Sequence, residues 1–203
     1  MRILKAFDGF CGLGGWSDGL SAEGFQVQGC EINPKVAAIY AERYPVIVAD
    51  FRGLDPLLFR GLDLIVGSPP CRDFSDYAHM SRGAVKRWKI PADPERGLEL
   101  VRAFTKFVDV AAPKYWLLEN VPRLEKYIGK PRMKTEIAPG MKRCFWGNFP
   151  NFLVPKDLSR PRTSEFHHHE FRGIHHYESC ERAKIPLPLA RALGRAVREA
   201  IEN

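Results

Sequence analysis

The fold is decided by residues 3–31, which read ILKAFDGFCGLGGWSDGLSAEGFQVQGCE. Residues 3–10 are mostly apolar and predict a buried strand, and residues 25–31 predict a second strand. Between them, a glycine-rich turn leads into residues 16–23, which we predict to form a helix. This order of strand, turn, helix and strand indicates parallel strands that are joined by a crossover helix.

The same alternation continues through the first two thirds of the chain. We predict further strands at residues 46–49, 62–67, 115–118 and 143–146. We predict further helices at residues 34–43, 95–111 and 186–201. Strands and helices in alternation place the chain in the α/β class, with a mostly parallel, doubly wound sheet. Ligands of such sheets bind outside the carboxyl ends of the strands.

Length and composition set further limits. The 203 residues suit a single domain over residues 1–203. The apolar runs fall short of the ~20 residues that span a bilayer, and the first residues are charged too soon for a signal peptide, so we expect a cytoplasmic protein. The formal net charge of +7 favours a polyanionic partner, although many small proteins are basic for no specific reason. Five cysteines without a C-x-x-C pair argue against a disulfide framework or a zinc ribbon.

A group of residues after the first three strands has the chemistry of a nucleoside site. Glycines in the first turn let a ligand approach the backbone at a helix N-terminus, a pattern that dinucleotide folds and plain tight turns share. Glu31 can accept hydrogen bonds from two ribose hydroxyls, and Asp50 can accept one from an adenine amino group. Either acid alone is more often a solvated surface residue, but three successive strand ends together predict a nucleoside cofactor site. We assign to it Phe10, Cys11, Gly12, Leu13, Gly14, Gly15, Glu31, Ile32, Asp50, Phe51 and Pro70.

The segment GSPPCRDFS at residues 67–75 carries a cysteine in a stiff turn. A lone cysteine is usually a buried structural residue. Cys71, however, follows two prolines that fix the direction of its sulfur, at the carboxyl edge of the predicted sheet. Methylation of cytosine at carbon 5 requires prior addition of a nucleophile at carbon 6, which a thiolate can supply. We therefore predict that Cys71 is a catalytic nucleophile.

Two further residues can hold the edge of a pyrimidine. Glu119 follows the strand predicted at 115–118, and a carboxyl group there can bind cytosine N3 and the exocyclic amine. The alternative for Glu119 is a helix-capping or ion-paired surface acid. Arg143 can hold cytosine O2 with its planar, permanently charged guanidinium, or else contact a phosphate.

With these motifs, the chain resembles the cytosine-5 DNA methyltransferase family along most of its length. Its motifs occur here in the family's order: the cofactor loop (10–15), the ribose acid (Glu31), the adenine acid (Asp50), the nucleophile motif (70–75), the catalytic Glu motif (119–121), the second Arg of the paired-Arg motif (Arg143) and the closing motif (185–193). The preserved order and spacing are more specific than any single motif.

The resemblance implies a Rossmann-like fold that uses S-adenosylmethionine and releases S-adenosylhomocysteine. It implies methyl transfer to carbon 5 of cytosine in double-stranded DNA, through a covalent adduct of Cys71 and after the base flips out of the duplex. The basic segment 76–96 would then close over the nucleic acid. We expect contacts to nucleic acid from Ser75, Arg82, Lys86, Arg87 and Lys89, and Trp88 is a candidate for stacking on a base.

The chain also departs from the family pattern. Met141 replaces the first Arg of the paired motif, and Lys184 stands where the closing motif usually has Asn. The family inserts a large target-recognition domain before the closing motif, whereas here only the irregular residues 151–181 fill that gap. Recognition could therefore be minimal, come from the basic segment, or come from a partner chain.

Two rival functions stay open on the sequence. One is an RNA cytosine-5 methyltransferase on the same scaffold, because a structured RNA can present an unpaired cytosine. The other is a non-catalytic regulatory homologue, against which Cys71, Glu119 and the intact cofactor loop argue. Restriction protection, viral self-marking and epigenetic use all fit, in the nucleoid of a prokaryote or in the cytoplasm of a host cell.

A cluster of histidines lies outside these motifs. It consists of His167, His168, His169, His175 and His176, with Cys180 close by. Histidine and cysteine bind zinc, but no pair here has zinc-finger spacing, so we expect a solvated or phosphate-facing loop and no metal site.

Overall fold

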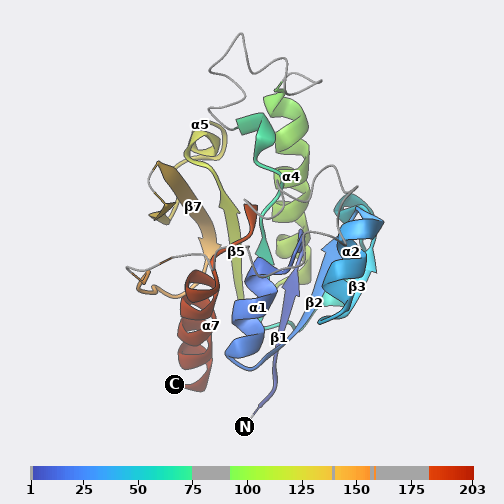
Figure 1. Ribbon diagram of the computed structural model, residues 1–203, viewed down its shortest axis with the longest axis vertical. Coiled ribbons are helices and arrows are strands. Elements are labelled where there is room, and N and C mark those ends of the chain that lie inside the picture. Colours follow the sequence, from blue (N-terminus) through green and yellow to red (C-terminus); the bar gives the residue numbers. More distant parts are fainter. Residues whose placement is uncertain (1, 75–91, 139, 156–157, 159–182) are drawn as a thin grey trace, which may run out of the picture.

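The computed structural model of the protein describes residues 2–74, 92–138, 140–155, 158 and 183–203 (Figure 1). Within them, seven strands form one sheet in the order β3-β2-β1-β4-β5-β7-β6. The strands are β1 (Leu4–Asp8), β2 (Phe25–Glu31), β3 (Val46–Val48), β4 (Leu64–Gly67), β5 (Tyr115–Asn120), β6 (Met133–Ala138) and β7 (Met141–Asn148). Neighbours from β3 to β5 are parallel, whereas β7 is antiparallel to both β5 and β6. The predicted mostly parallel α/β sheet is confirmed.

The described part of the chain has five α-helices, of which α1, α2 and α4 connect parallel strands. They are α1 (Gly15–Ala22), α2 (Pro34–Ala41), α4 (Pro94–Ala111), α5 (Glu125–Ile128) and α7 (Leu187–Glu202), with the short 3-10 turns η1 (Phe51–Gly53), η2 (Pro56–Phe59), η3 (Arg72–Phe74) and η5 (Pro122–Leu124). Asn33 caps α2 and Asp93 caps α4, and proline follows each cap at the first helical position. These local signals explain why the predicted helices agree with the observed ones to within two residues at each end.

The central strands bury side chains on both faces, which explains their nearly continuous apolar sequence. On the face that α1 and α7 cover, the strands contribute Leu4, Ala6, Leu64, Val66 and Leu117 to the core. On the face that α4 covers, they contribute Phe7, Ile65 and Leu118, which join a cluster of aromatic rings from η1, η2 and α4. No helix of the described part is long and apolar enough to cross a membrane.

The sequence patterns did not predict strand β6. β6 has the sequence MKTEIA, in which Ile137 is the one fully buried side chain. It lies at the edge of the sheet and pairs with β7 alone. A polar edge strand that follows a short helix lacks the apolar run on which the prediction of strands depended.

The C-terminal helix α7 lies alongside α1 (Figure 1). The two helices approach so closely that a Cβ on Gly19 would lie 2.3 Å from the Cβ of Ala190, and one on Gly15 would lie 2.5 Å from the backbone nitrogen of Ile185. Glu23, which ends α1, forms ion pairs with Arg191 and Arg195 of α7. The segment that resembles the closing motif therefore packs directly behind the glycine-rich turn.

Because Gly19 leaves no room for a methyl group, Gly19→Ala should lower the free energy of unfolding by about 1–3 kcal/mol through overpacking. Urea unfolding followed by circular dichroism measures this change. Gly53→Ala is the matched control, because nothing lies within 4 Å of a Cβ at that position. Combining Gly19→Ala with Ala190→Gly should restore much of the loss, and a Gly19→Ala variant as stable as the wild type would contradict this account of the packing.

Candidate active site

The predicted site residues gather at one edge of the sheet because they follow parallel strands. The glycine-rich turn follows β1, Glu31 ends β2, Asp50 follows β3, and Cys71 follows β4. Glu119 is the next-to-last residue of strand β5. Arg143 comes from antiparallel β7, one residue beyond the pairing of Asn120 with Cys144, so it lies at the same end of β5. Six segments distant in sequence thus converge, as the rule for α/β sheets predicts.

The glycine-rich turn is held in a conformation that only glycine adopts easily. Gly12 and Gly14 have φ angles of 48° and 80°. The turn is tied to β2, because Cys11 donates its backbone N–H to the carbonyl of Cys30 at 2.9 Å. Gly14 precedes α1 without a side-chain cap, so the first N–H groups of this helix receive no side-chain oxygen from that position. A Cβ on Gly12 would meet no atom within 4 Å, so this part of the backbone faces open space.

Glu31 links this turn to the end of β2. Its carboxylate accepts the backbone N–H of Gly12 at 3.2 Å on one oxygen and that of Asn33 at 2.8 Å on the other. Burial raises the pKa of Glu31 above its usual range. The backbone N–H groups of Gly12, Asn33 and Ile32 converge on this carboxylate, whose oxygens are acceptors of the kind that a pair of hydroxyls requires.

The residues around Glu31 offer apolar surface. The rings of Phe10 and Phe51 stack with their centroids 4.7 Å apart, and Phe51 is fully buried beneath. Ile32 is 63% exposed, which is unusual for a large aliphatic residue, and Pro70 is exposed as well. Phe10 and Ile32 are thus positioned to cover a flat apolar ligand, whereas Phe51 acts through Phe10.

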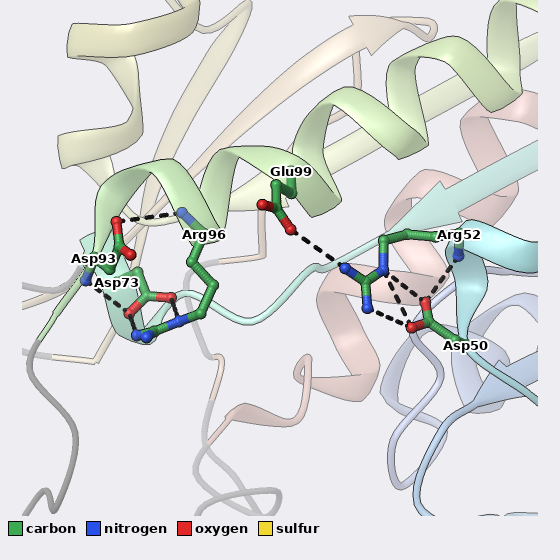
Figure 2. A network of polar contacts seen from close by, with 6 residues as sticks. All are labelled: Asp50, Arg52, Asp73, Asp93, Arg96 and Glu99. Carbon is green, nitrogen blue, oxygen red and sulfur yellow. Dashed lines mark hydrogen bonds and ion pairs between the residues drawn. The ribbon is translucent and has the colours of Figure 1, made fainter.

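Figure 2 shows the hydrogen bonds that the Asp50 carboxylate accepts from Arg52. Arg52 donates Nε to Oδ1 at 3.0 Å and Nη2 to Oδ2 at 2.5 Å, and also reaches Glu99 on α4. These hydrogen bonds hold the pKa of Asp50 below its usual range, so the group is an ionised acceptor. Its side chain is 35% exposed, so an exocyclic amine can reach it in competition with Arg52.

Taken together, the donors and acceptors fit the nucleoside part of a cofactor. Two carboxylates stand at the ends of neighbouring strands, glycine backbone faces open space, and an exposed aliphatic side chain lies beside them. This set matches the hydroxyls, the amine and the apolar base of an adenosine group.

The turn that carries Cys71 is fixed on both sides. Before it, Asn120 donates its side-chain amide to the carbonyl of Pro69 at 3.0 Å. After it, Asp73 forms an ion pair with Arg96 and accepts the backbone N–H of Asp93 at 3.1 Å, which ties η3 to the start of α4 (Figure 2). Cys71 itself is half-buried. Its sulfur is therefore held at a defined place, as the two prolines predict.

Glu119 and Arg143 form a buried pair next to Cys71. Arg143 Nε lies 3.2 Å from Glu119 Oε1, and both side chains are fully buried. Neither of these two atoms has a hydrogen bond of good geometry within the described residues. Burial raises the pKa of Glu119 and that of the Cys71 thiol, and the positive charge of Arg143 opposes both shifts. The three groups predicted as catalytic are thus brought together, with two polar atoms left for a ligand.

Sequence reasoning missed Asp8 at the end of β1. Asp8 is fully buried, Ser17 donates its hydroxyl to Oδ2 at 2.9 Å, and Tyr40 contacts the same hydroxyl at 2.8 Å. Oδ1 has no hydrogen-bond partner among the described residues. Burial raises the pKa of Asp8 to about 7. An acid at the end of an otherwise apolar strand was the available signal, since such a residue is rarely buried without a role.

The two residues that depart from the family pattern, Lys184 and Met141, both lie among the described residues. Lys184 forms an ion pair with Asp18 in the first turn of α1 at 2.9 Å, so it joins the closing segment to the glycine-rich turn. Met141 begins β7 and packs against the core on the α1 face.

Several predictions lie outside the described residues. They are the nucleic-acid contacts of Ser75, Arg82, Lys86, Arg87 and Lys89, the stacking of Trp88, and the cluster of His167, His168, His169, His175, His176 and Cys180. Within the described residues, no group of three or more His, Cys, Asp or Glu side chains could hold a metal ion.

Comparison with known proteins points to one family. A family model described as C-5 cytosine-specific DNA methylase matches residues 4–152. The chain is 31% identical over 173 residues to the type II methyltransferase M1.HphI of Haemophilus parahaemolyticus, which covers 77% of this chain and 44% of that relative. It is 31% identical over 131 residues to the type II methyltransferase M.HindV of Haemophilus influenzae, which covers 61% and 39%. The aligned segments span less than half the length of both curated relatives.

A solved structure supports the fold. The methyltransferase EhMeth of Entamoeba histolytica matches 80% of this chain and 58% of its own length, with a TM-score of 0.53 and 14% sequence identity.

The burial of Asp8 predicts a pH dependence of stability. Between the ordinary carboxyl pKa near 4 and the folded value of about 7, the folded state holds a proton that the unfolded state has lost, so stability falls as pH rises. Asp8→Asn removes this charge. From pH 5 to pH 8 the variant should gain roughly 2–3 kcal/mol relative to the wild type, measured by urea unfolding at each pH.

Asp63→Asn is the matched control for this measurement. Asp63 is equally buried but has an ion pair with Arg2 at 2.8 Å and accepts the backbone N–H of Lys5 at 3.0 Å. Losing that pair should destabilise the protein at pH 8. A stability difference between Asp8→Asn and wild type that is independent of pH would contradict the assignment for Asp8.

Proposed function

The chain belongs to the family of C-5 cytosine-specific DNA methylases, and from that membership we propose that it transfers a methyl group from S-adenosylmethionine to carbon 5 of cytosine in double-stranded DNA. The observation that carries the proposal is the placement of Cys71 in a fixed turn beside the buried pair of Glu119 and Arg143. Type II relatives make protection against a restriction enzyme the simplest role.

In this proposal the cofactor lies across the carboxyl edge of the sheet. The backbone of residues 10–15 would hold its amino-acid part, Glu31 its ribose and Asp50 its adenine amine, with Phe10 and Ile32 beside the base. When bound, S-adenosylmethionine supplies the methyl group that carbon 5 accepts. S-adenosylhomocysteine is then the product.

Cys71 performs the first covalent step. Its thiolate adds to carbon 6 of a flipped cytosine, which forms a C–S bond and moves the electron pair of the 5,6 double bond toward carbon 5 and N3. Burial raises the pKa of the free thiol, so the thiolate has to be stabilised where it is needed, and the adjacent guanidinium of Arg143 does so.

Glu119 and Arg143 hold the ring while this charge develops. A carboxyl group whose pKa is raised by burial keeps a proton at higher pH, and it can donate that proton to N3 as N3 becomes basic. Arg143 can donate its Nε–H to cytosine O2, the acceptor that this nitrogen lacks among the described residues. After methylation, water takes the proton from carbon 5, the 5,6 double bond re-forms as the C–S bond breaks, and Cys71 leaves as a thiolate. N3 returns its proton to Glu119.

Methyl transfer with labelled S-adenosylmethionine tests this function directly. Duplex DNA and total RNA are incubated in parallel, and the nucleosides of each product are then separated. Label in 5-methyldeoxycytidine is the expected result. Label in 5-methylcytidine alone would overturn the choice of DNA as the substrate. Label in neither nucleoside would overturn the activity of the isolated chain and point to a partner chain that supplies recognition.

Cys71→Ala should abolish methyl transfer, with a loss on the order of 1000-fold or more, because the variant lacks the thiol that is proposed to add to carbon 6. Its affinity for S-adenosylhomocysteine, measured by calorimetry, should stay within about twofold, since the thiol contacts only the base. Cys144→Ala is the control, because it removes a buried thiol of the core on the α4 face. Transfer at the wild-type rate by Cys71→Ala would refute the covalent mechanism.

A further inference from the structure

Trp16, the second residue of α1, reaches across to the turn that carries Cys71. Its indole Nε1 donates a hydrogen bond to the hydroxyl oxygen of Ser68 at 2.9 Å. The ring is 2% exposed and packs edge-on against Phe145, so the indole has one orientation. An indole N–H can donate but cannot accept a hydrogen bond. The Ser68 oxygen is therefore the acceptor in this pair.

This pairing decides where the proton of the Ser68 hydroxyl goes. A serine hydroxyl has a single proton, which rotates toward whichever acceptor is available. With Trp16 donating to the oxygen, the proton is left for the second partner of Ser68, which is the carboxyl group of Glu119. Ser68 is well placed for this contact because it directly follows Gly67, which ends β4 and pairs with Leu118, the residue before Glu119. It also precedes Pro69, whose carbonyl is held by Asn120.

Glu119 has few other neighbours that can fix it. Arg143 on β7 faces Oε1 at 3.2 Å, although this oxygen has no hydrogen bond of good geometry within the described residues. The other titratable groups that face Glu119 are the thiols of Cys71, beyond β4, and of Cys144 on β7. From α1, Trp16 contributes no charge. Ser68 is thus the one neutral donor that orients this carboxyl group among the contacts described.

We propose that Ser68 is a positioning residue whose hydroxyl donates its proton to one oxygen of Glu119, that the Trp16 indole sets the direction of this proton, and that Oε1 is thereby left for the target base. This inference rests on the proposed function, because Glu119 requires positioning only if it contacts a base. It joins the helix that begins at the cofactor turn to the carboxyl group that holds the pyrimidine.

The sign of the effect follows from the direction of donation. A hydrogen bond donated to a carboxylate stabilises the ionised form, and Ser68 accordingly lowers the pKa of Glu119, against the larger effect of burial. Without the hydroxyl, Glu119 should therefore keep its proton to a higher pH. Without the indole N–H, the serine proton is no longer directed toward Glu119. The pKa of Glu119 should then also rise, but by less than in the absence of the hydroxyl.

The test is a carbon-13 titration of Glu119 in the whole protein labelled on glutamate, with its signal assigned by its loss in Glu119→Gln. Ser68→Ala should raise the titration midpoint by about one pH unit, because the ionised carboxylate loses a hydrogen bond that stabilises it. Trp16→Phe should raise it by a smaller amount. Ser68→Thr, which keeps a hydroxyl, should restore most of the wild-type midpoint.

Trp146→Phe is the matched control for Trp16→Phe. Trp146 is also buried and donates its indole N–H, at 2.8 Å, but to the carbonyl of Gly129. The midpoint of Glu119 should not move in this variant. An unchanged midpoint in Ser68→Ala would overturn the proposal, and an unchanged midpoint in Trp16→Phe alone would overturn the part assigned to the indole.

Activity supplies a second readout that separates this proposal from the proposed function. Ser68→Ala should lower kcat for methyl transfer about tenfold, the equivalent of 1.36 kcal/mol, while leaving the affinity for S-adenosylhomocysteine unchanged. If the wild type transfers no methyl group, the proposed function fails, whereas the titration still reports on Ser68 and Trp16. If transfer is normal and the midpoint does not move, only the positioning role fails.

Discussion

The structure of this site depends on the buried ion pair of Glu119 and Arg143, in which the two facing atoms do not form a hydrogen bond of good geometry. Glu119 and Arg143 lie 3.2 Å apart with almost no exposure to solvent, yet Oε1 and Nε have no hydrogen bond of good geometry among the described residues. Burying two charges costs several kcal/mol per ion, and the cost is recovered only when geometry and additional hydrogen bonds are good. A pair left incomplete at the carboxyl edge of a sheet is therefore poor as a stabilising element and well suited to receive a polar ligand. Ser68, which contacts Glu119, and Asn120, which holds the Pro69 carbonyl, keep the surroundings in place.

The sheet explains how such a pair can arise. Parallel strands place Cys71 and Glu119 at neighbouring carboxyl ends, because β4 and β5 pair in parallel. Arg143 can reach the same end only because β7 runs the other way and pairs with β5. The antiparallel hairpin of β6 and β7 thus contributes one of the three proposed catalytic groups, and α7 folds back on α1 behind the glycine-rich turn (Figure 1). Fold and site are consequences of the same strand order.

The sequence was informative where the physical signal is local. Glycines in a turn, an acid at the end of an apolar run and a cysteine after two prolines are visible without a structure, and Glu31, Cys71 and Glu119 were placed at the correct strand ends for that reason. Contacts between distant residues had no such signal. The partner of Trp16 lies 52 positions away in sequence, and the contact of Tyr40 with the hydroxyl that Asp8 accepts joins residues from separate elements. The polar edge strand β6 was missed because its stability comes from pairing with β7 and not from burial of its own side chains.

The central claim is that Cys71 becomes covalently bound to carbon 6 of a cytosine. It is tested most directly with duplex DNA of mixed sequence in which cytosines carry fluorine at carbon 5, since fluorine cannot leave as a proton does and the C–S bond then cannot break. In the presence of S-adenosylmethionine, we expect a protein–DNA adduct that survives denaturation and maps to Cys71 by peptide mass analysis. Methylation of ordinary DNA without any adduct on fluorinated DNA, or an adduct on another residue, would contradict it.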